Sequence, residues 1–375
     1  MSNITLREVH SKKDLKKFVT FPFNLYKDSK YWVPPIIADE MATLSKDQNP
    51  VFEHAEARFF LAYKENTIVG RVAAIINRSE TEQQNLKKMR FGWFDTIDDL
   101  EVSKALLKQV EDIGKANNLE FIEGPVGFSN LDKVGALTEG FDEIGTMVTW
   151  YNYSYYPKHF EALGFAPEKE YLESRFYMSQ LGDLRFMKAH DLVVKRYGYK
   201  AGNYTTTKEL MPYLDEMFEL FNHSYKELST FVPISKKQQA YFKKKFINFV
   251  NPEYIKFVFD KDDKMIAFAV VLPSFSEALQ KVKGKLFPFG FLKLLKAKKH
   301  SNTMLFYLIG VDPKYHNKGV PAVIFYEFNK TFQKDKIETC YRTPELINNT
   351  ASLQIWKDFN AEVIKRRKTF KKIIN

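Results

Sequence analysis

The segment VDPKYHNKGVPAV, residues 311–323, combines a glycine and two prolines with basic side chains. An apolar, β-branched run precedes it and a helical pattern follows it, so Gly319 stands where a helix is expected to begin. Free backbone N–H groups from Lys318 to Val320 would face an anion at the positive end of that helix. Lys314 and His316 add positive charge, and the pattern indicates a pyrophosphate site. An ordinary strand-to-helix turn with one flexible glycine is the alternative.

A second segment, GPVGFSN at 124–130, places two glycines and a proline at the end of an expected strand. These residue types suit a loop that approaches a ligand or another backbone closely. Asp132 and Glu139 follow it, and a carboxylate here would remove a proton from an ammonium nucleophile. Solvated loop charges are the alternative for both residues. Tyr155 and Tyr156 would donate a proton to a leaving thiolate or line an apolar tunnel, and a place in a core or an interface is the alternative.

Other catalytic chemistries have no support in the sequence. The seven histidines have no metal-ligand spacing, and no Ser/His/Asp order is recognisable, so we expect no metal cofactor. Cys340 is the single cysteine, which excludes a disulfide framework and fits a reducing cytoplasm. Charged residues occupy the N-terminus where a signal peptide would be apolar, and no apolar run of about 18 residues occurs. A cytoplasmic protein without a membrane-spanning helix is expected.

Length and composition indicate a globular protein of two domains. The chain has 375 residues, of which 45% are hydrophobic and 27% charged, and this argues against disorder and an integral membrane protein. The net charge of +11 favours anionic partners. No nucleic-acid motif accompanies this charge, so a nucleic-acid partner is not expected. The 34 Phe and 20 Tyr residues indicate large apolar cores or clefts.

The same order of expected elements occurs twice along the chain. Each half has a hairpin, a strand, a helix, a second strand and a closing helix. These fall at 59–77, 91–97, 102–110, 119–126 and 155–164, and again at 254–272, 304–311, 321–332, 336–342 and 350–359. A boundary near Gln180–Leu184 gives two α/β domains, 1–182 and 183–375. Two unrelated α/β domains that share this order by chance are the alternative.

The segment around Gly319 resembles the phosphate motif of the GNAT superfamily of acyl-CoA-dependent N-acyltransferases. That motif has Val-x-Pro, an Arg or Gln, and a Gly-x-Gly turn before a helix. Val311, Pro313 and Gly319 match it, and His316 stands at the Arg or Gln place. Two other positions that usually hold Gly are Asn317 and Pro321. These departures predict reduced or altered binding of the CoA diphosphate.

Both halves also resemble the closing motif of this superfamily. In the second half the matching residues are Asn349, Trp356 and Asn360. In the first half they are Asn152, Tyr155, Tyr156 and the Ala-Leu-Gly-Phe run that ends at Phe165. The first half lacks the phosphate turn, because its segment at 94–99, FDTIDD, is acidic. A CoA diphosphate is therefore expected in the second half.

A narrower resemblance covers most of the chain. Segments at 21–26, 32–35, 124–129, 139–142 and 152–157 are similar to those of a bacterial double-GNAT family. Members of that broad group include enzymes of the bacterial ceramide synthase type, which pass a long acyl chain from a thioester donor to a sphingoid-base amine. The resemblance implies an α/β fold of two tandem GNAT-like domains, each a mixed sheet flanked by helices.

The residue patterns and the resemblance together assign candidate roles. The acyl donor is acyl-CoA or acetyl-CoA as co-substrate, or an acyl carrier protein. Its candidate binding residues are Val311, Lys314, His316, Lys318, Gly319, Val320 and Asn349. The candidate catalytic residues are Glu139, Asp132 and Tyr156. The candidate substrate-binding residues are Asn152, Tyr155, Phe291 and Leu294.

A basic insert, 274–302, separates the second hairpin from the strand that follows it. From Lys281 to Lys299 it has seven lysines and no acid. Its expected helix has Phe291, Leu294 and Leu295 on one face and lysines on another. This is typical of a helix on an anionic membrane surface, here over the entrance of a lipid substrate and at the inner membrane. A helix packed on the domain with a solvated lysine face is the alternative. The C-terminal run that begins at Lys365 is expected to add a basic rim.

These patterns together indicate an N-acyltransferase. Backbone N–H groups would polarise the thioester carbonyl, and a carboxylate or water would relay the proton of the attacking amine. A long-chain or lipid amine, such as a sphingoid base, is the preferred acceptor because of the many Phe residues and the basic insert. A soluble small-molecule N-acetyltransferase and a non-catalytic GNAT-like ligand-binding module are the alternatives.

Overall fold

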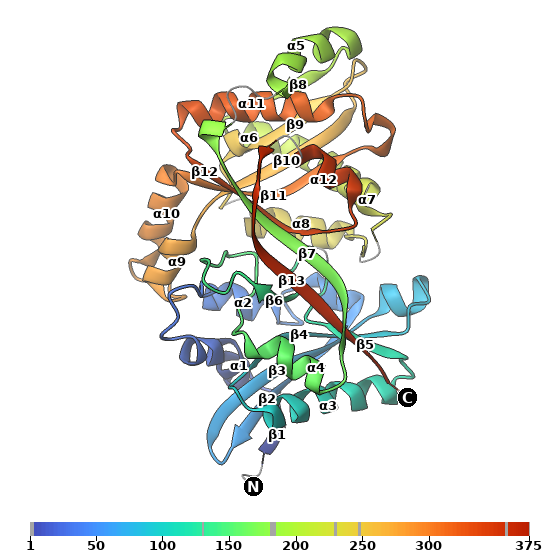
Figure 1. Ribbon diagram of the computed structural model, residues 1–375, viewed down its shortest axis with the longest axis vertical. Coiled ribbons are helices and arrows are strands. Elements are labelled where there is room, and N and C mark those ends of the chain that lie inside the picture. The colour runs from blue at the N-terminus through green and yellow to red at the C-terminus, as the bar shows by residue number, and fades with distance from the viewer. Residues whose placement is uncertain are drawn as a thin grey trace. The chain divides into compact units, whose positions relative to one another are not determined.

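The computed structural model describes residues 4–129, 131–180, 185–228, 231–246, 249–356 and 359–374 (Figure 1). The described residues form two compact units, each assembled from separate stretches of the chain. Unit 1 draws on Met1–Tyr171, Ser276–Phe291 and Lys365–Asn375, and unit 2 on Leu172–Phe275 and Leu292–Ile364. The domain boundary near Gln180–Leu184 falls on residues 181–184, outside the described part of the chain, and stays a prediction.

Unit 1 is built on a mixed sheet. Its strands are β1 (Ile4–Glu8), β2 (Ala55–Lys64), β3 (Thr67–Asn77), β4 (Lys88–Thr96), β5 (Phe121–Gly124), β6 (Ala136–Glu139), residues 166–171 of β7 (Ala166–Tyr177) and residues 365–373 of the C-terminal strand β13 (Glu362–Ile373). Neighbouring strands follow the order β1-β2-β3-β4-β5-β13, and β6 pairs with β13. The β4–β5 pair is parallel, whereas β1–β2, β2–β3, β3–β4 and the pairs of β13 with β5 and β6 are antiparallel.

Alternation along the strands gives unit 1 a core on each face of its sheet. Phe60 of β2 packs in the core that includes Leu106 of helix α3 (Leu100–Ala116). The preceding residue, Phe59, packs in the other core, where Phe18 of α1 (Lys12–Leu25) lies 5.4 Å away between ring centroids. Helices α2 (Ile37–Thr43), α4 (Tyr155–Ala162) and α9 (Ser276–Val282) complete the unit.

The basic run from Lys365 is a strand of the sheet in unit 1, and the predicted basic rim is wrong for its buried members. Lys365, Arg367 and Thr369 alternate along β13 and are buried. Lys365 Nζ donates to the carbonyl of Ile144 at 2.6 Å, and Arg367 Nη1 donates to the carbonyl of Gly135 at 3.4 Å. Carbonyl partners inside the unit allow these cations to be buried with their long aliphatic stems.

Unit 2 is likewise built on paired strands of mixed direction. Its strands are β7 (Ala166–Tyr177, of which residues 172–177 belong to this unit), β8 (Lys200–Gly202), β9 (Ile255–Phe259), β10 (Met265–Pro273), β11 (Thr303–Val311) and β12 (Thr339–Leu346). They follow the order β7-β12-β11-β10-β9-β8. The β11–β12 pair is parallel, and β8–β9, β9–β10 and β10–β11 are antiparallel. Its helices are α5 (Arg185–Tyr197), α6 (Thr207–Leu210), α7 (Leu214–Tyr225), α8 (Lys236–Phe246), α10 (Gly290–His300, of which residues 292–300 belong here), α11 (Val320–Lys334) and α12 (Thr350–Trp356).

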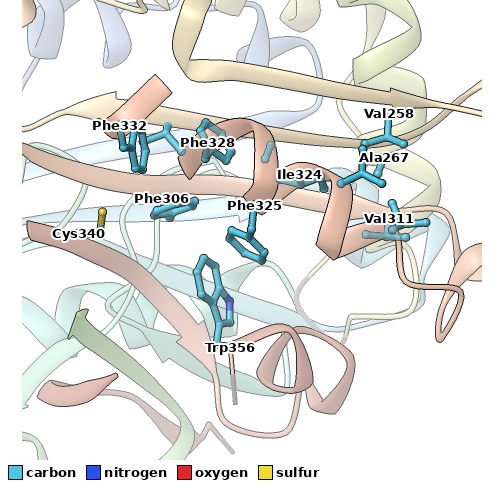
Figure 2. Packing of buried hydrophobic residues seen from close by; sticks show 14 of the residues in the cluster. Val258, Ala267, Phe306, Val311, Ile324, Phe325, Phe328, Phe332, Cys340 and Trp356 are labelled. Carbon is cyan, nitrogen blue, oxygen red and sulfur yellow. The ribbon is translucent and has the colours of Figure 1, made fainter. Parts of the chain in front are cut away.

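Helix α11 packs on the sheet of unit 2 through an aromatic core (Figure 2). Phe325 and Phe328 of α11 lie 5.9 and 5.4 Å from Phe306 of β11 between ring centroids. Trp356 of α12 lies 5.0 Å from Phe306 and 5.1 Å from Phe325, and Figure 2 shows the Phe325 ring directed toward it. The aromatic side chains predicted to fill large cores thus join both helices to one sheet.

The two units repeat one order of elements. Unit 1 has β2-β3-β4-α3-β5, and unit 2 has β9-β10-β11-α11-β12, where α9 and α10 come between β10 and β11 in the sequence. In each unit the long helix joins two strands that pair in parallel, β4 with β5 and β11 with β12. The predicted α/β fold of two similar units, each a mixed sheet flanked by helices, is confirmed.

Each unit has a β-bulge in the strand that precedes its long helix. In β4, Trp93 and Phe94 together stand opposite one residue of β3, and Trp93 has a φ of 43°. In β11, Tyr307 is the extra residue, because Val270 pairs with Leu308 and Val271 with Phe306. Bulges of this kind redirect side chains and end strand pairing, often beside active sites.

The aromatic core of unit 2 gives a first prediction. Phe325→Ala removes a side chain that is 3% exposed, and the cavity should lower the free energy of unfolding by about 3–5 kcal/mol. Chemical denaturation followed by circular dichroism measures the change. The same substitution at Phe287, which is 81% exposed, serves as the control and should change it by less than about 0.5 kcal/mol. Equal effects at the two positions would contradict the core.

Candidate active site

Helix α11 begins at a glycine that no other residue type would replace without strain. Gly319 has a φ of 73°, and a Cβ atom there would lie 2.7 Å from Cγ2 of Val193 in α5. Before it, β11 ends at the buried Val311, and the Asp312 carboxylate accepts a hydrogen bond from the backbone N–H of Lys314 at 2.9 Å. The turn is therefore fixed by the backbone, and it leaves the helix start without a side-chain cap.

The start of α11 offers two backbone donors, one fewer than the sequence predicts. The N–H of Lys318 donates to the carbonyl of Tyr315 at 3.2 Å, so it is not free. Pro321 has no N–H, and the N–H of Ala322 donates to the Gly319 carbonyl at 2.9 Å. Within the described ranges, no hydrogen bond joins the N–H of Gly319 or Val320 to another group. These two unpaired N–H groups are the candidate donors for an anion, with Gly319 half-buried and Val320 buried.

The side chains predicted to surround an anion are exposed at this helix start. Lys314, His316 and Lys318 all face solvent, and Lys318 Nζ lies 4.9 Å from the ring centroid of Tyr315. The Tyr315 hydroxyl donates to Asp260 at 2.7 Å, and this hydrogen bond raises the pKa of Tyr315 to about 12. Tyr315 thus ties the basic turn to the end of β9.

The equivalent helix start in unit 1 is closed by carboxylates of the chain itself. Asp99 caps α3 by accepting the N–H of Glu101 at 3.0 Å, and its hydrogen bond with Lys64 lowers the pKa of Asp99. Asp98 pairs with His159 of α4 at 3.2 Å. An incoming anion would meet two negative charges here, so of these two helix starts the one in unit 2 is suited to a diphosphate.

The parallel strands of each unit separate beyond a short paired stretch. In unit 2 the pairing runs from Thr303–Thr339 to Phe306–Arg342, and the bulge at Tyr307 follows directly. The Thr343 hydroxyl donates to the carbonyls of Phe306 and Tyr307 at 3.1 and 3.3 Å. In unit 1 the loop after β5 closes the separation, because the N–H of Val126 donates to the Phe91 carbonyl at 2.8 Å.

A charged cluster lies at the end of β12, and Arg342 is its one member outside the polar run PELINN, 344–349, and the helix that follows. Arg342 forms an ion pair with Glu345, and the Ser352 hydroxyl donates to the same carboxylate. The guanidinium carbon of Arg342 lies 4.8 Å from the Trp356 ring centroid. Burial lowers the pKa of Arg342 to about 10. Within the part of the chain that the structure describes, the Nε and Nη2 atoms of Arg342 and Oε2 of Glu345 make no hydrogen bond, so the two side chains interact as an ion pair only. The polar run PELINN after an expected strand was the available signal.

Asn349, predicted to hold the acyl donor, acts as a helix cap. Its Oδ1 atom accepts the N–H of Ser352 at 3.2 Å at the start of α12. Its own N–H donates to the Leu346 carbonyl at 2.9 Å. Asn349 therefore positions α12, which supplies Ser352 to the charged cluster.

The two predicted catalytic carboxylates of unit 1 lie in different surroundings. Asp132 accepts hydrogen bonds from the N–H and hydroxyl of Ser129 at 2.9 and 3.1 Å, within the loop after β5. Glu139 ends β6 with a side chain that is 66% exposed, 3.2 Å from Arg366. The contacts of Asp132 hold a loop, whereas Glu139 remains accessible to water.

Tyr156 lies in a buried hydrogen-bonded network of unit 1. Its hydroxyl oxygen accepts the N–H of Thr96 at 3.0 Å and lies 2.9 Å from the Tyr26 hydroxyl. Tyr26 donates to Asp95 at 2.7 Å, and Asp95 pairs with Arg71. Burial raises the pKa of Tyr156 well above its ordinary value. These contacts occupy the hydroxyl that was predicted to serve a leaving thiolate.

The remaining predicted residues divide between backbone support and exposure. Asn152 accepts the N–H of Leu137 at 2.6 Å and donates to the Leu137 carbonyl at 3.1 Å, which supports β6. Tyr155 donates to the Thr96 carbonyl at 2.6 Å. In α10, Phe291 is exposed, whereas Leu294 is buried against the protein. Of the four predicted substrate-binding residues, Phe291 has the most exposed side chain.

No group of three or more His, Cys, Asp and Glu side chains in the described ranges is placed to hold a metal ion. No described helix is long and apolar enough to cross a membrane.

Solved structures with the same architecture define the class of fold. A tandem GNAT protein from the clavulanic acid biosynthesis pathway matches 100% of this chain and 99% of its own, with a TM-score of 0.60 and 10% sequence identity. A GCN5-related N-acetyltransferase from Sphaerobacter thermophilus matches 99% of this chain and 96% of its own, with a TM-score of 0.53 and 8% identity. The chain therefore has the tandem GNAT fold.

Curated relatives define the family more narrowly. Protein YghO of Escherichia coli K12 is 30% identical over 379 residues, covering 98% of this chain and 95% of its own. The chain therefore belongs to the family of Protein YghO, a bacterial tandem GNAT family. The bacterial ceramide synthase of Caulobacter vibrioides is 26% identical over 299 residues, covering 78% of this chain and 76% of its own. No protein-family model matches the sequence.

The charged cluster of β12 gives a second prediction. Glu345→Gln leaves the Arg342 cation buried without its counter-charge, and this should lower the free energy of unfolding by about 3–5 kcal/mol. Replacing both residues with Met should cost less than Glu345→Gln, because no buried charge then remains. Urea denaturation measures both variants. The matched control is Glu277→Gln, which breaks an exposed pair with Lys281 and should change stability by less than about 1 kcal/mol. A cost at Glu345 as small as at Glu277 would show that the cluster is solvated.

Proposed function

We propose that this protein is an N-acyltransferase that binds an acyl-CoA at the start of α11 and transfers its acyl group to an amine. The observation that carries the proposal is the contrast between the two long helices. The helix start in unit 2 keeps two backbone donors, at Gly319 and Val320, beside exposed basic side chains. The corresponding start in unit 1 is capped by Asp99. A CoA diphosphate would therefore bind in unit 2.

The proposed reaction needs positioning, an electrophile and a proton acceptor. The amine nitrogen attacks the thioester carbon, the C–S bond breaks, and CoA leaves as the thiol after it takes up a proton. Backbone N–H groups at the bulge of β11 would stabilise the oxyanion, as strand bulges beside active sites can. The amine's proton would pass to a carboxylate or through water. The two candidate carboxylates, Asp132 and Glu139, lie in unit 1. Glu345 lies in the same unit as the proposed donor site, but it is paired with Arg342.

A long-chain amine is the proposed acceptor. The relative from Caulobacter vibrioides is named a bacterial ceramide synthase, and a ceramide is an N-acylated sphingoid base. The acyl donor is proposed to be a long-chain acyl-CoA or an acyl carrier protein, with Lys314, His316 and Lys318 as the cations that meet its phosphates. Phe291 of the basic insert is exposed and would contact an alkyl chain.

Two other functions keep support from particular observations. A soluble small-molecule N-acetyltransferase is supported by the GCN5-related N-acetyltransferase from Sphaerobacter thermophilus, which has the same fold. A non-catalytic ligand-binding module is supported by the helix start itself, because Pro321 and the bonded N–H of Lys318 leave only two donors for a diphosphate.

A donor-binding experiment tests the site and gives a third prediction. Val320→Pro removes one of the two free N–H groups at a helix position where proline is well tolerated. Val320→Ala is the matched control, because it truncates the same buried side chain but keeps the N–H. Calorimetric titration with decanoyl-CoA should give a dissociation constant about 10- to 100-fold larger for the proline variant than for the alanine variant, the value of one hydrogen bond to a charged group. Equal dissociation constants for the two variants would show that the N–H of Val320 does not bind the acyl donor.

A turnover experiment separates the three functions. Acyl transfer from acetyl-CoA and from palmitoyl-CoA is measured by mass spectrometry with a long-chain sphingoid base and with a short soluble diamine as acceptors. An N-acylated sphingoid base made only from the long donor supports the proposal. Acetylation of the short amine alone establishes the soluble acetyltransferase. Binding of acyl-CoA with no product from any pair establishes the binding module.

A further inference from the structure

The basic insert presents large apolar side chains to solvent. Phe287 and Phe289 are 81% and 72% exposed. They belong to a set that we call the apolar face: Phe287, Phe289, Phe291, Leu292 and Leu295. Phe287 and Phe291 lie 6.0 Å apart between ring centroids, and Phe291, Leu292 and Leu295 follow one side of α10. Single exposed apolar residues are common, but five exposed ones within the nine residues 287–295 indicate an interaction surface.

The segment that carries the exposed Phe residues is anchored on unit 1. Gln280 of α9 donates to the carbonyls of Lys30 and Trp32 at 2.8 and 3.0 Å. The carbonyl of Gly284 accepts the N–H of Ile37 at 3.0 Å. The φ of Gly284 is 73°, and a Cβ atom there would lie 2.6 Å from the Phe23 ring. The exposed phenyl rings therefore project from a fixed base.

Exposed lysines accompany the apolar face along the insert. The exposed members of the insert are Lys281, Lys283, Lys285, Lys293, Lys296 and Lys299. No Asp or Glu occurs between Glu277 and Asp312. The insert thus combines exposed apolar and exposed cationic side chains, and both properties match the boundary between anionic headgroups and acyl chains.

We propose that the apolar face docks this protein on an anionic lipid bilayer. The five apolar side chains enter the headgroup region, and the lysines of the insert meet the lipid phosphates. A second copy of this chain is a poorer occupant. Pairing two such faces would bring the lysines of both copies together, where like charges repel, and lysine is depleted at protein interfaces. The proposal concerns a surface other than the start of α11, and it requires no turnover.

Vesicle flotation of the full chain tests the proposal and gives a fourth prediction. Wild type should bind vesicles of phosphatidylglycerol and phosphatidylcholine, bind pure phosphatidylcholine at least tenfold more weakly, and lose affinity as salt is raised. Phe287→Ser with Phe289→Ser should weaken binding to the anionic vesicles by at least tenfold. Lys293, Lys296 and Lys299 changed to Gln should weaken it by roughly fivefold per lysine and flatten the salt dependence.

Matched variants and a second measurement decide between outcomes. The control variant has Gln at three exposed positions of α1, namely Lys12, Lys13 and Lys16. It removes the same amount of charge and should leave vesicle binding nearly unchanged. An equal loss in this control would reduce the effect to net charge and overturn the proposal. Absence of wild-type binding to anionic vesicles would overturn it as well. The apolar face would instead be assigned to a second copy if wild type does not bind vesicles and sedimentation analysis shows a dimer. The Phe287 and Phe289 substitutions should then dissociate that dimer.

Discussion

The whole site depends on a parallel strand pair that is joined over only a few residues in each unit. Parallel strands need a crossover, and here the crossover is the long helix that begins beyond the point where the two strands separate. Pairing ends at Arg90 in unit 1 and at Phe306 in unit 2. Beyond that point the backbone needs other partners, because buried N–H and carbonyl groups are costly when unpaired. Each unit meets this need with a bulge and a substitute donor, Val126 in unit 1 and Thr343 in unit 2.

The same framework gives the two helix starts opposite electrostatic properties. In unit 1, Asp99 satisfies the helix N-terminus and the loop after β5 bonds to β4, so the framework is closed by its own residues. In unit 2, Gly319 provides no cap, and Pro321 fixes the first turn while removing a donor. Two N–H groups and three exposed basic or titratable side chains remain. Of these two helix starts, the one in unit 2 has no capping carboxylate, which is why we propose that the acyl donor binds in unit 2.

The sequence predicts elements and local turns better than it predicts long-range partners. The repeated order of strands and helices and the left-handed glycine at 319 follow from local patterns, and both are present. The predicted rim at Lys365 failed because a basic run and a strand with alternate buried lysines look alike until carbonyl partners such as Ile144 are known. Tyr156 and Asn152 were identifiable as polar residues of a motif, but their partners Thr96 and Leu137 lie far away in the chain. The Arg342–Glu345 pair depends on Trp356 for burial, which no local pattern reveals.

The apolar face bears on function because its exposed side chains contribute little to the free energy of folding. A side chain that is as exposed in the native state as in the unfolded chain gains almost no transfer free energy on folding. Phe287 and Phe289 are close to that limit, whereas Leu294 on the same insert is buried and stabilises it. Polar residues at 287 and 289 would therefore serve folding equally well. The exposed phenylalanines instead lower the solubility of the protein. Accompanied by lysines that a bilayer would neutralise, these rings gain their transfer free energy only when the protein meets a surface that accepts them.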